Sequence, residues 1–137
     1  MPEPTLDALT AQYLTPDARL ESILAEMAQE IEGATALVIG DASGLPVASV
    51  VRGRKTLATT AMATLALNAA TKVTASLGLG APDDILIEAG PWLIIVTPLG
   101  SGFTLCGVFP GGGNLRATRL SMREHAEEIC ELLEDLR

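Results

Sequence analysis

The sequence predicts an α/β fold of the α+β sandwich type, in which helices pack on antiparallel strands. Residues 33–52 and 84–109 contain short apolar runs separated by turns rich in glycine and proline, which is typical of strands joined as hairpins. Three longer segments, near residues 16–31, 56–77 and 115–136, space their apolar residues at helical intervals. With 137 residues, of which 3% are aromatic, the chain is expected to form one domain around an aliphatic core.

The first helix is predicted to begin at Thr15 and Pro16, because threonine caps helices and proline is favoured at their first position. Gly33 ends it. Its apolar residues recur on one face: Leu20, Ile23, Leu24, Met27, Ala28 and Ile31. Residues 1–14 are interpreted as a frayed arm or a short helix that docks on the body or on a neighbour. The domain proper therefore covers residues 15–137.

A β-hairpin follows the first helix. Residues 34–39 form an apolar strand, and residues 45–51 return as a second one. The turn between them contains Asp41, which can accept bonds from its own backbone, and Gly44, which can adopt positive φ.

The helix at residues 56–77, with Thr56 as its expected cap, carries one charged residue, Lys72. On a helical wheel its polar residues occupy one arc: Thr60, Thr64, Asn68, Thr71 and Lys72. Apolar residues fill more than half of the circumference, which exceeds what one sheet contact requires. We therefore predict a homodimer in which this helix and the apolar edge strand at 46–51 meet their copies. The predicted interface residues are Val47, Val50, Val51, Ala63, Leu67 and Ala70.

Strands are predicted at residues 84–88, 92–97 and 103–109, joined as a meander. A glycine-rich loop then leads to Asn114, the expected N-cap of the last helix. That helix carries Arg116, Arg119 and Arg123 in its first half and acidic residues in its second half, an order that opposes the helix dipole. We interpret its charged face as solvated or, alternatively, as a partner surface. The sequence does not explain Leu120, which falls on this charged side.

Catalytic chemistry is not indicated. The net charge of −8 argues against nucleic acid or an anionic membrane as the main partner. His125 is the only histidine and is interpreted as structural, while Asp83 and Asp84 are read as a solvated turn. The loop at 110–114 lacks the phosphate-loop pattern. Cys106 and Cys130 are expected to be two buried free thiols in a reducing compartment, rather than a disulfide or a metal site. We therefore expect no catalytic residue, no cofactor and no metal. No signal peptide is evident, so a soluble cytoplasmic protein is expected.

The chain resembles the roadblock family of dynein light-chain-like domains, which also includes bacterial and archaeal regulators of small GTPases. Three parts carry the resemblance. They are LESILAEMAQEIEGATALVIGDASGLPVASV at residues 20–50, the alanine- and threonine-rich helix with Leu65, Asn68 and Ala69, and FTLCGVFPGGGNLRATRLSMREHAEEI at residues 103–129. Together they extend over nearly the whole chain after residue 14.

The resemblance implies a five-stranded antiparallel sheet in the order 2-1-5-4-3, with the second helix on one face and the other two helices on the opposite face. It also implies a non-catalytic dimer that scaffolds a small Ras-like GTPase and that, in some members, stimulates GTP hydrolysis. The corresponding partner surface would be Thr60, Thr64, Asn68, Thr71 and Lys72. The alternatives are a small-molecule sensor and a structural light chain of a larger assembly.

Overall fold

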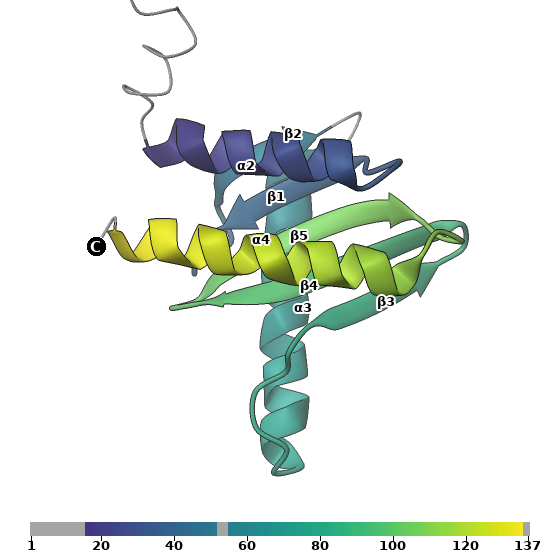
Figure 1. The fold of residues 1–137 in the computed structure, drawn as a ribbon. Helices are drawn as coiled ribbons and strands as arrows, with labels where there is room; N and C mark the ends of the chain where they lie inside the picture. Colours follow the sequence, from purple (N-terminus) through teal and green to yellow (C-terminus); the bar gives the residue numbers. More distant parts are fainter. Residues whose placement is uncertain (1–15, 52–54, 136–137) are drawn as a thin grey trace, which may run out of the picture.

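A computed structural model describes residues 16–51 and 55–135. Its elements, in chain order, are α2 (Pro16–Glu30), β1 (Ala36–Gly40), β2 (Pro46–Val51), α3 (Thr56–Ser76), β3 (Ile85–Ala89), β4 (Trp92–Gly100), β5 (Phe103–Pro110) and α4 (Leu115–Asp135). The strands form one antiparallel sheet in the order β2-β1-β5-β4-β3. Helices α2 and α4 lie on one face of the sheet and α3 lies on the other (Figure 1). The predicted fold class and strand order are confirmed.

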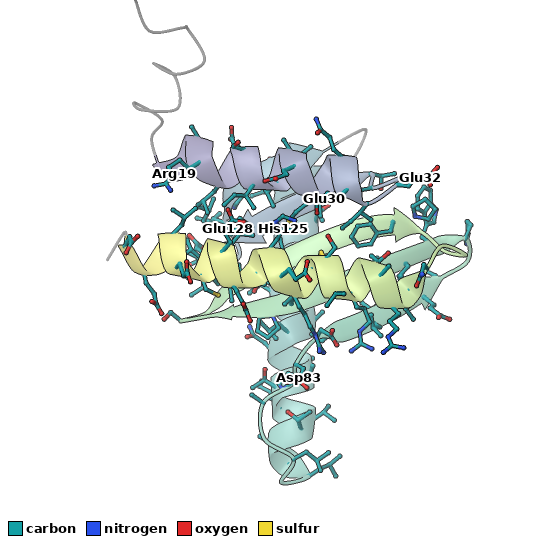
Figure 2. The ribbon with its side chains drawn as sticks, in the orientation of Figure 1. Arg19, Glu30, Glu32, Asp83, His125 and Glu128 are labelled. Carbon is teal, nitrogen blue, oxygen red and sulfur yellow. The ribbon has the colours of Figure 1, made fainter. Side chains whose placement is uncertain are left out.

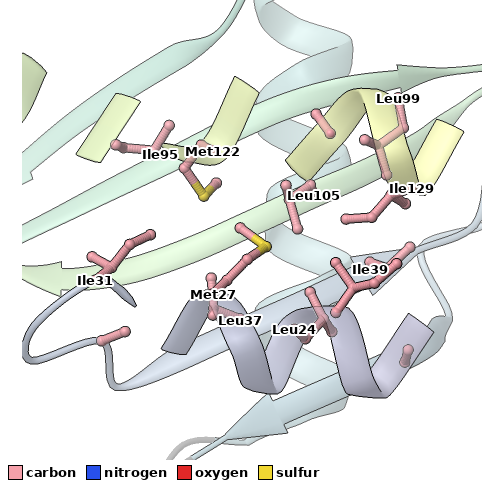
Figure 3. Packing of buried hydrophobic residues seen from close by; sticks show 14 of the residues in the cluster. Leu24, Met27, Ile31, Leu37, Ile39, Ile95, Leu99, Leu105, Met122 and Ile129 are labelled. Carbon is pink, nitrogen blue, oxygen red and sulfur yellow. The ribbon is translucent and has the colours of Figure 1, made fainter. Parts of the chain in front are cut away.

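The main core lies between the sheet and the pair of helices α2 and α4. Figure 3 shows Met27 of α2 and Met122 of α4 among side chains from the central strands, including Leu37 and Leu105. These four side chains are at most 1% exposed. The apolar stripe predicted for the first helix faces this core, which explains why α2 is stable at this position despite its short length.

The hairpin turn forms as predicted. The Asp41 carboxylate accepts hydrogen bonds from the backbone amides of Ser43, at 2.9 Å, and Leu45, at 3.0 Å. Gly44 has φ +83°, a backbone conformation that favours glycine. The turn therefore fixes the register of β1 against β2 through its own side-chain and backbone bonds.

Strand β4 is longer than predicted, because it continues through Pro98 to Gly100. Strand β3 begins with Ile85 opposite Val96, so the part of β4 beyond Val96 has β5 as its ladder partner. Proline has no amide to donate and is tolerated where a strand lacks a neighbour on one side. The sequence pattern could not reveal this, because it depends on where the neighbouring strand starts.

The predicted helix caps have different outcomes. Asn114 caps α4, and its side-chain oxygen accepts a hydrogen bond from the amide of Ala117 at 3.1 Å. The prediction that Thr56 caps α3 was wrong, because Lys55 occupies the N-cap position without a side-chain bond and Thr56 is the first helical residue. Within the described ranges, no helix has both the length and the apolar character needed to cross a bilayer.

Helix α3 crosses the strands steeply. Its first half lies over the sheet, whereas its C-terminal end protrudes beyond the β3 side of the sheet (Figure 1). Where α3 lies over the sheet, Ala63 and Leu67 pack in a small second core with Val38, Val96 and Cys106. Thr60 meets the sheet at Gly40, where an added Cβ would overlap the Thr60 methyl group. The absence of a side chain at Gly40 thus sets how closely α3 approaches the sheet.

We predict that Gly40→Ala destabilises the protein by about 1–3 kcal/mol, because the new methyl group overpacks the contact with Thr60. The double variant Gly40→Ala with Thr60→Ser should recover much of this loss, since serine keeps the hydroxyl but lacks the clashing methyl group. Urea denaturation of both variants and of Thr60→Ser alone measures the coupling. Equal losses in the single and double variants would contradict this account.

Candidate protein-interaction surface

Helix α3 presents a buried side and a broad exposed apolar side. Thr60, Ala63 and Leu67 are its buried residues and face the sheet. On the exposed side, four large apolar side chains are 58–63% exposed: Leu57, Met62, Leu65 and Val73. Contiguous exposed apolar surface of this kind is typical of a protein-interaction site.

The threonine hydroxyls of α3 bond to the helix itself. Thr60 donates to the carbonyl of Thr56 at 2.7 Å, Thr64 to that of Thr60 at 3.1 Å, and Thr71 to that of Leu67 at 2.7 Å. Because these hydroxyls already have partners, covering the helix would leave few donors unsatisfied. The surface of α3 can therefore lose water at lower cost than its polar composition indicates.

An apolar groove of about 410 Å³ lies beside α3. One wall comes from α3, with Met62 and Ala66, and the floor comes from a part of the sheet that α3 leaves uncovered, with Ile87, Trp92 and Ile94. The groove has the apolar lining expected of a surface that receives another apolar element.

The groove is continuous with the β3 edge of the sheet. Leu86 and Ile87 of β3 are 39% and 37% exposed, and β4 is the only strand that pairs with β3 among the described residues. Leu77 and Leu79, at the protruding end of α3, are 66% and 70% exposed. Apolar side chains, a free strand edge and a protruding helix end thus occur together on one side of the molecule.

The predicted partner stripe is not one continuous exposed surface. Thr60 is 1% exposed and contacts Gly40, so its assignment to an exposed stripe was wrong. Thr64 is half-buried and lies near Gly44 of the hairpin turn. Asn68, Thr71 and Lys72 are exposed. The wheel correctly grouped these residues but could not indicate that the sheet covers one margin of the polar arc.

The predicted dimer residues also lie differently from expectation. Ala63 and Leu67 are buried against the sheet of their own chain, although Ala63 also lines the groove beside α3, and their role as dimer contacts stays a prediction. Val47 and Val50 pack against the main core beneath α2 rather than presenting their side chains to a copy. Ala70 is half-buried, and the side chain of Val51 lies outside the described set. Met62 and Ala66, which belong to the same apolar arc but were not among the predicted contacts, line the groove beside α3, whereas Leu65 is 59% exposed and does not line it.

His125 connects the two helices that cover the main core. Its side chain is 12% exposed, and its Nε2 lies 2.7 Å from a Glu30 carboxylate oxygen of α2, while Nδ1 lies 3.5 Å from Glu128 (Figure 2). Burial alone would lower the pKa of His125, but its bonds to both carboxylates and their charges outweigh burial and raise the pKa. The residue acts as a clamp between α2 and α4.

Asp84 is not part of a solvated turn, so that interpretation was wrong. Its side chain is 8% exposed and accepts bonds from Arg119, at 3.2 and 3.3 Å, and from Arg123, at 3.5 Å. These contacts fasten the first half of α4 to the segment that enters β3. Arg119 and Arg123, which the sequence predicts on a charged surface, therefore also have a structural role.

The two cysteines are free, as predicted, but only Cys106 is buried as expected, because Cys130 is partly exposed. Cys106 is buried beneath α3, and burial raises the pKa of its thiol to about 12. Cys130 lies on the other face of the sheet, where its thiol donates to the carbonyl of Leu99 at 2.9 Å. The sheet separates the two thiols, and the high pKa of Cys106 disfavours the reactive thiolate.

The glycine-rich loop before α4 borders a cavity of about 590 Å³. Its lining includes Glu30 and Glu32 together with Asn114. Two carboxylates oppose an anion, so this lining does not favour phosphate even though a helix N-terminus lies beside it.

The fold defines a small α+β domain in which one helix exposes apolar side chains. The family model of the roadblock/LC7 domain matches residues 20–109, and the chain belongs to this family. None of the curated protein sequences matches the chain.

Solved structures with the same fold include bacterial proteins of this family. MglB of Myxococcus xanthus has a TM-score of 0.82 at 16% identity, over 91% of this chain and 95% of that one. The gliding protein MglB of Thermus thermophilus has a TM-score of 0.80 at 17% identity, over 90% and 94% of the two chains. A roadblock/LC7 domain of Streptomyces avermitilis has a TM-score of 0.78 at 16% identity, over 83% and 97%.

We predict that the His125 clamp makes stability depend on pH. Because the pKa of His125 is raised in the folded state, its contribution is fully present below the ordinary histidine pKa of about 6.5. The contribution is lost as pH rises through the folded-state pKa. Urea titrations of the wild type between pH 6 and 9 should show this fall, and His125→Gln should flatten it. The same pH dependence in both proteins would exclude the clamp.

Proposed function

We propose that this protein is a non-catalytic, dimeric regulator or scaffold that binds a small Ras-like GTPase, with stimulation of GTP hydrolysis as its candidate effect. The observation that carries the proposal is the exposed apolar surface of α3 together with the groove beside it. Membership of the roadblock/LC7 family and the shared fold of MglB support a regulator of this type.

The geometry favours dimerisation through β3 and α3. Helix α3 passes over the start of β3, where Leu67 packs near Ile85, while the groove lies farther along the strand at Ile87. A two-fold axis near Ile87 would pair β3 with its copy and carry the protruding end of the partner's helix over the groove. This arrangement covers the apolar groove, the free edge and the protruding end together.

The β2 edge, which the sequence predicts as the pairing strand, is a less favourable interface. The inner side chains of β2 already pack against the core of their own chain, and pairing at β2 would leave the groove and the protruding end of α3 in water. The apolar surface that the described residues leave exposed to water lies at the β3 edge. We therefore assign the dimer to β3 and retain β2 pairing as the alternative that an experiment can distinguish.

The flank of α3 away from the groove is the proposed GTPase surface. It includes Leu57, Leu65, Asn68 and Lys72, which are all exposed. Lys72 is the one charged residue of α3, so most of this surface can be desolvated without burying a charge. Because α3 contains no arginine, a stimulating effect would act by ordering catalytic groups of the GTPase itself.

The groove also bears on the sensor alternative. Its volume of about 410 Å³ would hold a small apolar molecule, but few polar groups converge on it to orient such a ligand. Dimerisation through β3 would also fill it. A structural light chain would use the same surfaces and would differ from a regulator only in its partner.

We predict that Met62→Glu converts the dimer to monomers, because the charge would be buried in the apolar interface. Analytical ultracentrifugation at micromolar concentration measures the mass. The matched control is Gln29→Glu, which adds the same charge on the exposed surface of α2 and should remain dimeric. A monomeric wild type would refute dimerisation.

Amide hydrogen exchange distinguishes the two edges. If the dimer forms through β3, the β3 amides of the wild type should exchange more slowly than those of Met62→Glu, because β3 of the second copy occupies the free edge. The β2 amides should exchange at similar rates in both proteins. Protection that depends on dimerisation at β2 instead would return the interface to the strand first predicted.

We predict that Leu65→Glu combined with Asn68→Arg abolishes GTPase capture while leaving the dimer intact. Both residues are exposed, so the changes should not disturb the fold. Capture of candidate Ras-like GTPases, loaded with GDP or a GTP analogue, measures the effect. Ser22→Glu with Gln29→Arg on α2 adds the same two charges as a control. Full capture by the α3 variant would place the GTPase on another surface.

A further inference from the structure

Helix α4 carries an exposed stripe of residues on its outer surface. The stripe advances in steps of three or four residues along the helix and consists of Arg116, Leu120, Arg123, Glu127, Glu131 and Glu134. All of these residues are exposed, and Leu120 is 57% exposed. Steps of this size place side chains on one side of a helix, as in coiled coils.

The contacts of α4 within the chain leave this stripe largely free. One flank meets α2 through His125 and Glu30, and the other meets Asp84 through Arg119. Of the stripe, Arg123 also contacts Asp84 but is half exposed. The charged side chains of Arg116, Glu127, Glu131 and Glu134 have no ion-pair or hydrogen-bond partner within residues 16–51 and 55–135.

The order of charges along the stripe is unfavourable for an isolated helix. Arginines near the N-terminus and glutamates near the C-terminus both oppose the helix dipole, and the first turn of α4 contains no acidic residue. The stripe carries two of the nine basic residues of a chain with net charge −8. This order of charges lowers the stability of the monomer, and the exposed Leu120 lies among the charges. Both features indicate a partner whose charges run in the complementary order.

We propose that the α4 stripe pairs with the α4 stripe of a second copy in antiparallel orientation. A two-fold axis on the outer side of α4, level with position 125 along the helix, sets Arg116 against Glu134 of the second copy and Arg123 against Glu127, and each pairing occurs twice. Leu120 then packs against the aliphatic stem of Glu131. The second copy is the occupant because one helix supplies both complementary halves, so an isologous contact satisfies both.

This pairing is distinct from the proposed α3 dimer. The two helices lie on opposite faces of the sheet, and the α3 contact is apolar whereas the α4 contact is ionic (Figure 1). Salt should therefore weaken α4 pairing and spare α3 pairing. The pairing does not depend on GTPase binding.

Zero-length carbodiimide cross-linking of Arg116→Lys tests the contact directly. Residues 116 and 134 are about 27 Å apart along one helix, so a 116–134 cross-link can form only between copies. Mass spectrometry should find this cross-link at low salt and lose it in 0.5 M NaCl. The control Arg116→Lys with Glu134→Gln should not form it. Its absence from Arg116→Lys at low salt would overturn the proposal.

A charge-swap experiment provides an independent test. Arg116→Glu with Leu120→Glu makes the stripe wholly acidic apart from Arg123, and Glu131→Arg with Glu134→Arg makes it more basic. Each variant alone should associate through α4 at least tenfold more weakly than the wild type in low-salt sedimentation, whereas an equimolar mixture should recover the association.

Two further variants serve as controls for the charge-swap experiment. Glu21→Arg with Glu32→Arg changes the net charge as the second variant does, at exposed positions off the stripe, and should behave as the wild type. Adding Met62→Glu to any variant removes the proposed α3 dimer, so loss of one contact can be told from loss of the other. Wild-type association by either swapped variant alone would refute α4 pairing.

Discussion

The sheet has two apolar faces to remove from water, and the described residues, 16–51 and 55–135, fully cover only one of them. Helices α2 and α4 bury one face under side chains such as Met27 and Met122. Helix α3 alone lies on the other face, where it crosses steeply and leaves a groove beside it. Because uncovered apolar area favours association, this incomplete coverage connects the fold to its proposed role as a dimeric regulator.

Small residues determine how α3 sits on its face. Gly40 allows the Thr60 methyl group to approach the β1 backbone, and Ala63 keeps the following turn close to the sheet. The hydroxyls of Thr60 and Thr64 donate to carbonyls of the helix itself, so the close contact does not leave these donors without an acceptor. The same chemistry leaves the outer side of α3 able to lose water when another chain covers it.

Polar contacts between elements hold α4 in register with the rest of the domain. His125 reaches Glu30 on α2, and Arg119 reaches Asp84 before β3, so the two flanks of α4 are fixed by different elements. These contacts use the inner and lateral residues of the helix. The outer stripe is largely free of such contacts, and the contacts within the chain do not explain its order of charges.

The sequence by itself determined the elements, the antiparallel meander, the hairpin turn at Asp41 and the apolar stripe of α2, because these depend on local spacing and backbone chemistry. Strand order 2-1-5-4-3 came from the family resemblance, and the structure agrees.

Only the tertiary structure decided which part of the α3 arc faces the sheet, and therefore that Thr60 and Leu67 are internal whereas Met62 and Leu65 are exposed. A helical wheel gives the angles between residues but not the direction of the sheet, which depends on long-range contacts such as that between Gly40 and Thr60. The pairing of Asp84 with Arg119 escaped prediction for the same reason, since these residues are 35 positions apart in the chain.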